Sequence, residues 1–134
     1  MMKTRALILL IYAFLGGITG LQKILGEFPP KWYIDKYSAT LISWLPGGIV
    51  ISFMIIVLLE LAIASLFVLA LLKGEFKESQ TPKFSKWGFH VSLLLFLILF
   101  FGSFLAQSYD NGFMDFGYFA FTIYLMSFFE KREE

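Results

Sequence analysis

Cysteine is absent from this 134-residue chain, and its absence excludes several kinds of site. Without thiols the protein forms no disulfide, no thiolate metal site and no thiol redox relay. A strong net charge is also lacking, because 11 basic and 10 acidic residues leave a formal charge of +1. The sequence therefore gives no reason to expect a nucleic acid partner.

Groups that support catalysis or metal binding are scarce. His90 is the one histidine, and no second histidine or nearby aspartate completes a set of metal ligands. No nucleophile triad and no glycine-rich phosphate loop is present. We therefore expect no metal site, and the sequence favours a protein that is not an enzyme on its own.

Apolar residues are abundant instead, at 58% hydrophobic and 19% aromatic, which is typical of a membrane protein. A helix needs roughly 20 apolar residues to cross about 30 Å of hydrocarbon. The sequence predicts an all-α bundle of four transmembrane helices in a single domain over 1–134. The predicted spans are about 6–25, 47–72, 84–106 and 112–130.

The ends of two predicted spans depend on capping residues. Thr81 and Pro82 resemble the N-cap and first position of the third helix. Asp110 or Asn111 would cap the fourth helix and place Asp115 in its first turn. Lys3 and Arg5 before an apolar stretch also fit a signal peptide, but no A-x-A cleavage site follows, so we favour a span.

The segment between the first two spans, residues 27–46, is too long for a turn and too apolar for a solvated linker. Pro29 and Pro30 stop the first helix. The apolar and aromatic residues that follow predict a short amphipathic helix on the membrane surface, which would cap the bundle: Trp32, Tyr33, Tyr37, Leu41, Trp44 and Leu45.

Basic residues are unevenly distributed between the two sides of the membrane. Eight lie on the side of the termini: Lys3, Arg5, Lys73, Lys77, Lys83, Lys86, Lys131 and Arg132. Three lie on the other side: Lys23, Lys31 and Lys36. Because positive loops stay in the cytoplasm, we expect both termini there, in a bacterial inner (plasma) membrane.

One carboxylate, Glu60, lies near the middle of the second span. An unpaired charge at that depth costs at least roughly 2.5 kcal/mol, so we expect Glu60 to be protonated, paired or facing a polar cavity. It is either a proton carrier or ligand site, which we favour, or a hydrogen-bonding group that packs helices together. Helical rise places four hydroxyl groups near its height, those of Tyr12, Thr19, Thr122 and Tyr124.

Lys23 and Gln22 lie toward the far end of the first span. Lys23 lies roughly 10 to 12 Å above Glu60 by helical rise. It either extends to the interface, bends inward to pair with Glu60, or lines a polar pocket with Gln107 and Tyr109 under the amphipathic segment. Gly16, Gly17 and Gly20 favour close helix packing, with a ligand gap beside Glu60 as the alternative.

The first two spans resemble the DoxX-like family of small four-helix membrane proteins. The resemblance lies in GGITGLQKILGEFPP, with Gly20 and Lys23, and in LLELAIASLFVLALLKGEF, with Glu60, Ala62 and Ala64. The last two spans match in hydropathy alone. The resemblance implies a four-helix bundle with Lys23 and Glu60 as its polar positions, and a link to quinone-dependent oxidation or to partner assembly. Small multidrug exporters also use a membrane glutamate, but theirs lies in the first span.

Three functions follow as hypotheses. The first is a noncatalytic accessory or ligand-binding subunit beside other membrane proteins or further copies of itself. The second is a quinone-linked redox subunit in which Glu60 exchanges a proton, with quinone as the one cofactor considered. The third is a proton-coupled transporter, which would need a dimer, with Gly16 and Gly20 as its interface.

Overall fold

The computed structural model describes residues 2–130 and is all-helical over that range. Four helices are long and apolar enough to cross a membrane, as predicted: α1 (Met2–Leu25), α3 (Gly48–Leu72), α4 (Lys83–Leu105), and α5 (Tyr109–Met126) together with the short 3-10 helix η2 (Ser127–Phe129). A short helix α2 (Lys31–Tyr37) and a 3-10 turn η1 (Leu41–Trp44) join α1 to α3. The predicted positions Lys131 and Arg132 lie outside the described residues.

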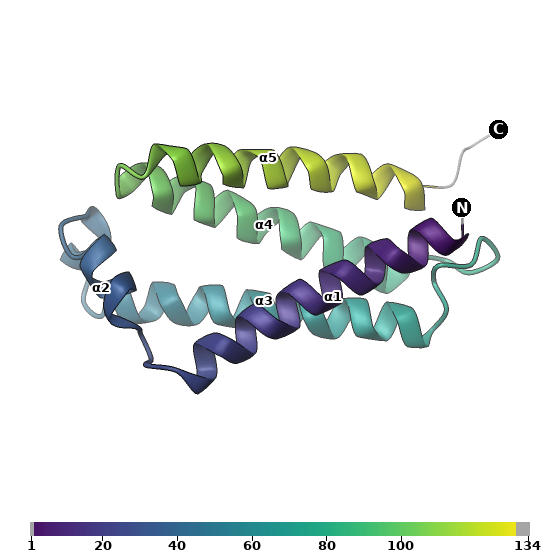
Figure 1. Ribbon diagram of the computed structural model, residues 1–134, viewed down its shortest axis with the longest axis horizontal. Coiled ribbons are helices and arrows are strands. Elements are labelled where there is room, and N and C mark those ends of the chain that lie inside the picture. Colours follow the sequence, from purple (N-terminus) through teal and green to yellow (C-terminus); the bar gives the residue numbers. More distant parts are fainter. Residues whose placement is uncertain (1, 131–134) are drawn as a thin grey trace.

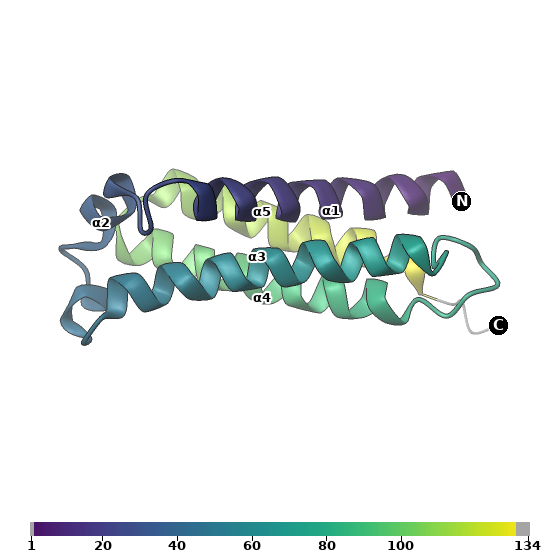
Figure 2. The same ribbon diagram turned by 90° about the horizontal axis from the view of Figure 1, so that it is seen from below.

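The four long helices pack in a chain of neighbours, α1 on α3, α3 on α4 and α4 on α5. The start of α1, the end of η2 and the loop 73–82 lie at one end of the bundle, the terminal end, and α2 lies at the other, the α2 end (Figures 1 and 2). At the terminal end α1 contacts η2, which continues α5, because Arg5 Nε donates to the carbonyl oxygen of Phe128 at 2.6 Å. Toward the α2 end α1 runs obliquely and diverges from α5 (Figure 1).

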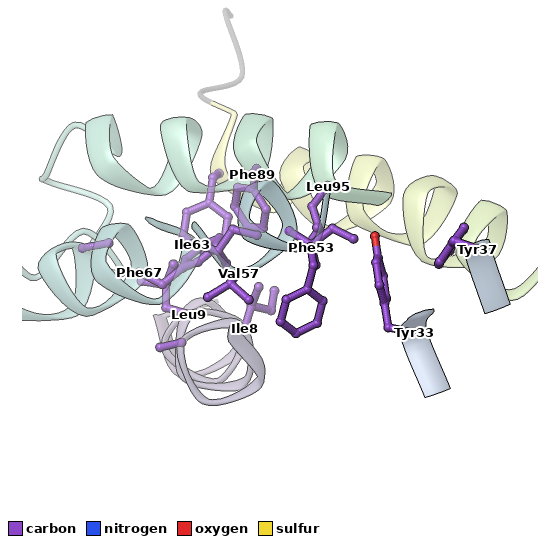
Figure 3. Close-up of a cluster of buried hydrophobic side chains, with 14 residues drawn as sticks. Ile8, Leu9, Tyr33, Tyr37, Phe53, Val57, Ile63, Phe67, Phe89 and Leu95 are labelled. Carbon is purple, nitrogen blue, oxygen red and sulfur yellow. The ribbon is translucent and has the colours of Figure 1, made fainter. Parts of the chain in front are cut away.

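Aromatic side chains fill the core between these helices. Phe53, Phe67 and Phe89 are fully buried, and Figure 3 shows them among the aliphatic side chains of α1 and α3. The ring centroids of Phe67 and Phe89 lie 5.1 Å apart at a steep angle, the edge-to-face geometry that aromatic pairs prefer. Phe67 and Phe89 thus pack in the terminal half of the bundle, toward the end of α3 and the start of α4.

The amphipathic helix predicted between the first two spans is present as α2. Tyr33 and Tyr37 are buried on its inner face, whereas Trp32 is 57% exposed. The Tyr33 ring packs edge-on against Phe53 with a centroid distance of 4.9 Å, and its hydroxyl lies 2.8 Å from Ser52 Oγ. The helix therefore covers the α2 end of the bundle through two tyrosines.

The predicted cap of the third span is wrong. Pro82, not Thr81, occupies the N-cap position of α4, and no side chain there caps the helix. The carboxylate of Glu75, in the preceding loop, instead accepts the backbone N–H groups of Phe84 at 2.8 Å and Ser85 at 2.7 Å. It also accepts the hydroxyl of Ser85 at 2.6 Å. A negative charge at a helix N-terminus satisfies these otherwise unpaired donors.

The predicted start of the fourth span is also wrong. The helix α5 begins at Tyr109, so Asp110 and Asn111 lie within its first turn and Ser108 occupies the N-cap position. Asp115 therefore lies beyond the first turn, and it accepts a hydrogen bond from Ser103 of α4 at 3.1 Å. The carboxylate of Asp115 therefore contacts the neighbouring helix α4 and not the N-terminus of its own helix.

Candidate functional site

Lys23 and Glu60 form an ion pair between α1 and α3, with Lys23 Nζ 2.6 Å from Glu60 Oε1. Glu60 is 6% exposed, and the side chain of Lys23 is 23% exposed. Lys23 therefore bends inward instead of extending to the interface. Helical rise alone places Lys23 well above Glu60 only if α1 and α3 are parallel. Because α1 crosses α3 obliquely (Figure 1), the long side chain of Lys23 reaches Glu60.

Two glycines of α1 let this helix approach α3 at Glu60. A Cβ atom on Gly16 would lie 2.8 Å from the backbone carbonyl oxygen of Glu60, and one on Gly20 would lie 2.9 Å from the side chain of Leu61. Gly17 is only half-buried, with Ala64 Cβ 3.8 Å from its Cβ position. The space beside Gly16 and Gly20 is thus occupied by α3, which leaves neither a ligand gap there nor a free surface for a dimer.

The second carboxylate oxygen of Glu60, Oε2, is buried and has no hydrogen-bond partner among the described residues. A buried polar atom without a partner costs free energy, particularly where lipid replaces water. The lysine also uses one of the three donors of its ammonium group in the pair with Glu60. The ion pair therefore retains both an unused acceptor and unused donors.

A cavity of about 200 Å³ adjoins this ion pair at the α2 end, which we term the polar cavity. All five helices contribute to its lining: Lys23 from α1, Tyr33 and Tyr37 from α2, Phe53 and Glu60 from α3, Leu99 and Ser103 from α4, and Asp115 and Tyr118 from α5. Figure 1 shows that α1 diverges from α5 toward the α2 end, and two tyrosines of α2 line the cavity. The structure thus places Lys23 in a pocket under the amphipathic helix. Gln107 and Tyr109 are not among the lining residues.

Two further charged side chains in this lining were not predicted from the sequence as site residues. Lys36 and Asp115 add one positive and one negative charge. Tyr37 is 4% exposed, and its hydroxyl has no hydrogen-bond partner among the described residues. Burial, and to a smaller extent the neighbouring Tyr33 and Asp115, raise the pKa of Tyr37 to about 12. Tyr37 is therefore a neutral hydrogen-bond donor at physiological pH.

The other hydroxyl groups predicted near Glu60 lie elsewhere. Tyr12 and Thr122 hydrogen bond to each other at 2.7 Å and join α1 to α5. Thr19 donates to the carbonyl oxygen of Leu15 at 2.6 Å, within its own helix. Tyr124 is 60% exposed. Gln22 is exposed as well, so of the seven residues proposed for ligand binding or proton transfer only Lys23 and Glu60 line the polar cavity.

A periodic signal in the fourth span would have identified Asp115. Asn111, Asp115 and Tyr118 follow one another at intervals of four and three residues, which places them on one face of a helix. All three line the polar cavity. The predicted start near Gly112 placed Asp115 in the first turn of the helix, whereas α5 begins at Tyr109.

Compared with known proteins, the chain matches no family model, no curated protein and no solved structure. Any inference about its family or its function therefore depends on the residues described above.

Proposed function

We propose that this protein is a DoxX-like integral membrane protein that binds a small ligand in the polar cavity and acts as a noncatalytic subunit. The observation that carries the proposal is the ion pair between Lys23 and Glu60, which adjoins this cavity and leaves a buried carboxylate oxygen without a partner within residues 2–130. Gly20, Lys23 and Glu60, on which the family resemblance depends, lie together at this site, and this supports the proposal.

A purely structural role explains the ion pair less well. A buried ion pair contributes little net stability, because desolvation of both charges offsets their attraction. Ionisable residues inside a membrane are costly and are retained mostly for function. A ligand that carries both a donor and an acceptor would form hydrogen bonds with Glu60 Oε2 and with the free donors of Lys23.

The size of the polar cavity restricts the ligand. At about 200 Å³ it is smaller than the roughly 300–1,000 Å³ of pockets for drug-sized molecules. It is somewhat larger than the apolar cavity of about 150 Å³ that holds one benzene molecule. The ligand, or the part of it that enters, is therefore about the size of one ring.

The ligand is recognised on the side of the membrane that faces away from the termini. The excess of basic residues at the terminal end supports a cytoplasmic location for both termini, in a bacterial plasma membrane. The polar cavity would then open toward the outer surface, beneath α2. Other membrane subunits or further copies of this chain are the proposed partners.

A quinone is the second candidate ligand. Aromatic rings line the polar cavity, among them Trp32, Tyr33, Phe53 and Tyr118, and Lys23 and Tyr37 supply donors for a quinone carbonyl. A bound quinone would supply the redox chemistry, and the side chains would position its ring. The transporter hypothesis loses its proposed dimer interface, because Gly16 and Gly20 pack within the chain.

The test is native mass spectrometry of the gently extracted protein as wild type, Glu60→Gln and Glu78→Gln. Glu78 is exposed in the loop 73–82 and serves as the matched control. A small molecule retained by the wild type and by Glu78→Gln, but lost from Glu60→Gln, is the expected result. Equal retention in all three proteins, or retained protein subunits with no small molecule, would overturn ligand binding by Glu60.

A further inference from the structure

A second cavity, of about 230 Å³, lies beside the polar cavity between α3 and α4. Its lining is mostly apolar and includes Ile42, Ile98, Phe101 and Leu105, so we term it the apolar cavity. Four side chains line both cavities: Tyr33, Tyr37, Ile56 and Leu99. The two cavities are therefore neighbours that share these four residues.

Tyr37 is the less firmly held of the two tyrosines in this partition. Tyr33 hydrogen bonds to Ser52, whereas Tyr37 has no such partner among the residues described. The hydroxyl of Tyr37 points at α4, where a Cβ atom on Gly102 would lie 3.0 Å from it. The ring thus fits against α4 because position 102 carries no side chain. A rotation of Tyr37 would join the two cavities without moving a transmembrane helix.

The charges around the polar cavity balance. Lys23 and Lys36 offset Glu60 and Asp115, so the site has no excess of either sign to attract a strongly charged ligand. Hydrogen-bonding groups remain available at Glu60 Oε2 and at the hydroxyl of Tyr37. A head group without net charge that both donates and accepts hydrogen bonds matches this lining.

We propose that the two cavities form one divided site for a net-neutral amphiphile, an inference that rests on the proposed ligand site at Glu60. The head, about one ring in size, lies beside Lys23 and Glu60. The apolar chain passes Tyr37 into the apolar cavity, against Ile98 and Leu105. Tyr37 and Gly102 together determine whether a chain can pass.

A benzamide with a para-alkyl chain that ends in a photoreactive diazirine tests this arrangement. Its amide donates and accepts hydrogen bonds, and its chain end marks the residues that it reaches. The full-length protein in lipid nanodiscs is irradiated with this probe, and labelled residues are mapped by mass spectrometry. The variants are Glu60→Gln, Gly102→Leu and the control Gly117→Leu, since a Cβ atom on Gly117 would meet nothing within 4 Å.

We expect the label to concentrate on Ile98, Phe101 and Leu105, which line the apolar cavity and not the polar cavity, in the wild type and in Gly117→Leu. It should fall roughly fivefold or more in Gly102→Leu, the lower end of what an overpacked site costs. A loss of at least similar size, roughly fivefold, is expected in Glu60→Gln, because the ligand loses a hydrogen bond to the carboxylate. Leu105→Trp, which enlarges a side chain lining the apolar cavity, replaces Gly102→Leu if that variant does not fold.

The outcomes distinguish this inference from the proposed function. Thermal stabilisation by benzamide without a chain is measured in parallel for the wild type and Glu60→Gln. If benzamide stabilises only the wild type while labelling of Ile98, Phe101 and Leu105 is the same in Gly102→Leu and Gly117→Leu, the divided site is overturned and ligand binding at Glu60 stands. Identical labelling in the wild type and Glu60→Gln overturns the divided site as well. The proposed function then depends on the native mass spectrometry test, that is, on whether a co-purified small molecule is lost from Glu60→Gln.

Discussion

Lys23 Nζ lies 2.6 Å from Glu60 Oε1, although 37 residues separate them in the chain. The contact joins α1 to α3 at the turn where Gly16 and Gly20 bring these helices together. It also places one charge of each sign beside the polar cavity. The close packing of glycines and the polar site are therefore parts of one arrangement.

The first prediction concerns the coupling between these two charges. Lys23→Met and Glu60→Gln should each lower the free energy of unfolding, and the double variant should lose less than the sum of the two. Residues in direct contact show coupling energies of roughly 0.5–3 kcal/mol. Unfolding by SDS in mixed micelles measures the cycle. Lys31→Met, which removes an exposed lysine at the start of α2, serves as the control, and strictly additive losses would show that the pair is not coupled.

Adjacent glycines of α1 provide the second prediction. Gly16→Ala should destabilise the protein by about 1–3 kcal/mol, the usual cost of overpacking, because its Cβ atom would meet the α3 backbone at 2.8 Å. Gly17→Ala should be close to neutral, since the nearest atom lies 3.8 Å from its Cβ position. The same SDS titration compares the two variants. Equal stability would mean that α1 and α3 do not pack through Gly16.

The third prediction concerns the loop at the terminal end. Glu75→Ala removes the acceptor of three hydrogen bonds at the start of α4 and should cost about 1–3 kcal/mol. Glu78→Ala, three residues later and exposed, should change stability by no more than about 0.5 kcal/mol. Hydrogen exchange of the first turn of α4 should rise only in Glu75→Ala. Unchanged exchange there would show that Glu75 does not cap the helix.

The spans were predictable from the sequence because long apolar runs depend on composition alone. The ends of the spans were less predictable, because capping can depend on groups that are not adjacent in the chain. The local rule selected Thr81 and Pro82, whereas the carboxylate that satisfies the first turn of α4 belongs to Glu75. A residue nine positions away leaves no local pattern.

The polar site was only partly predictable. Glu60 and Lys23 were identifiable as isolated polar residues in apolar spans, but their contact depends on the oblique path of α1 (Figure 1). The polar cavity required five segments to meet, and sequence spacing gives no distance between helices. Tyr37 resembled one more aromatic residue of an interfacial helix, and only its burial distinguishes it.

The last prediction tests the orientation on which the outward-facing cavity depends. Because the chain has no cysteine, single substitutions provide unambiguous labels. Ala39→Cys, exposed after α2, should react with a membrane-impermeant maleimide on intact cells, and Ser79→Cys, exposed in the loop 73–82, should react only after lysis. This orientation is expected because eight basic residues lie on the side of the loop 73–82 and three on the other side, and the more basic side stays in the cytoplasm. The reverse labelling would place the polar cavity on the cytoplasmic side, so its ligand would then have to come from inside the cell.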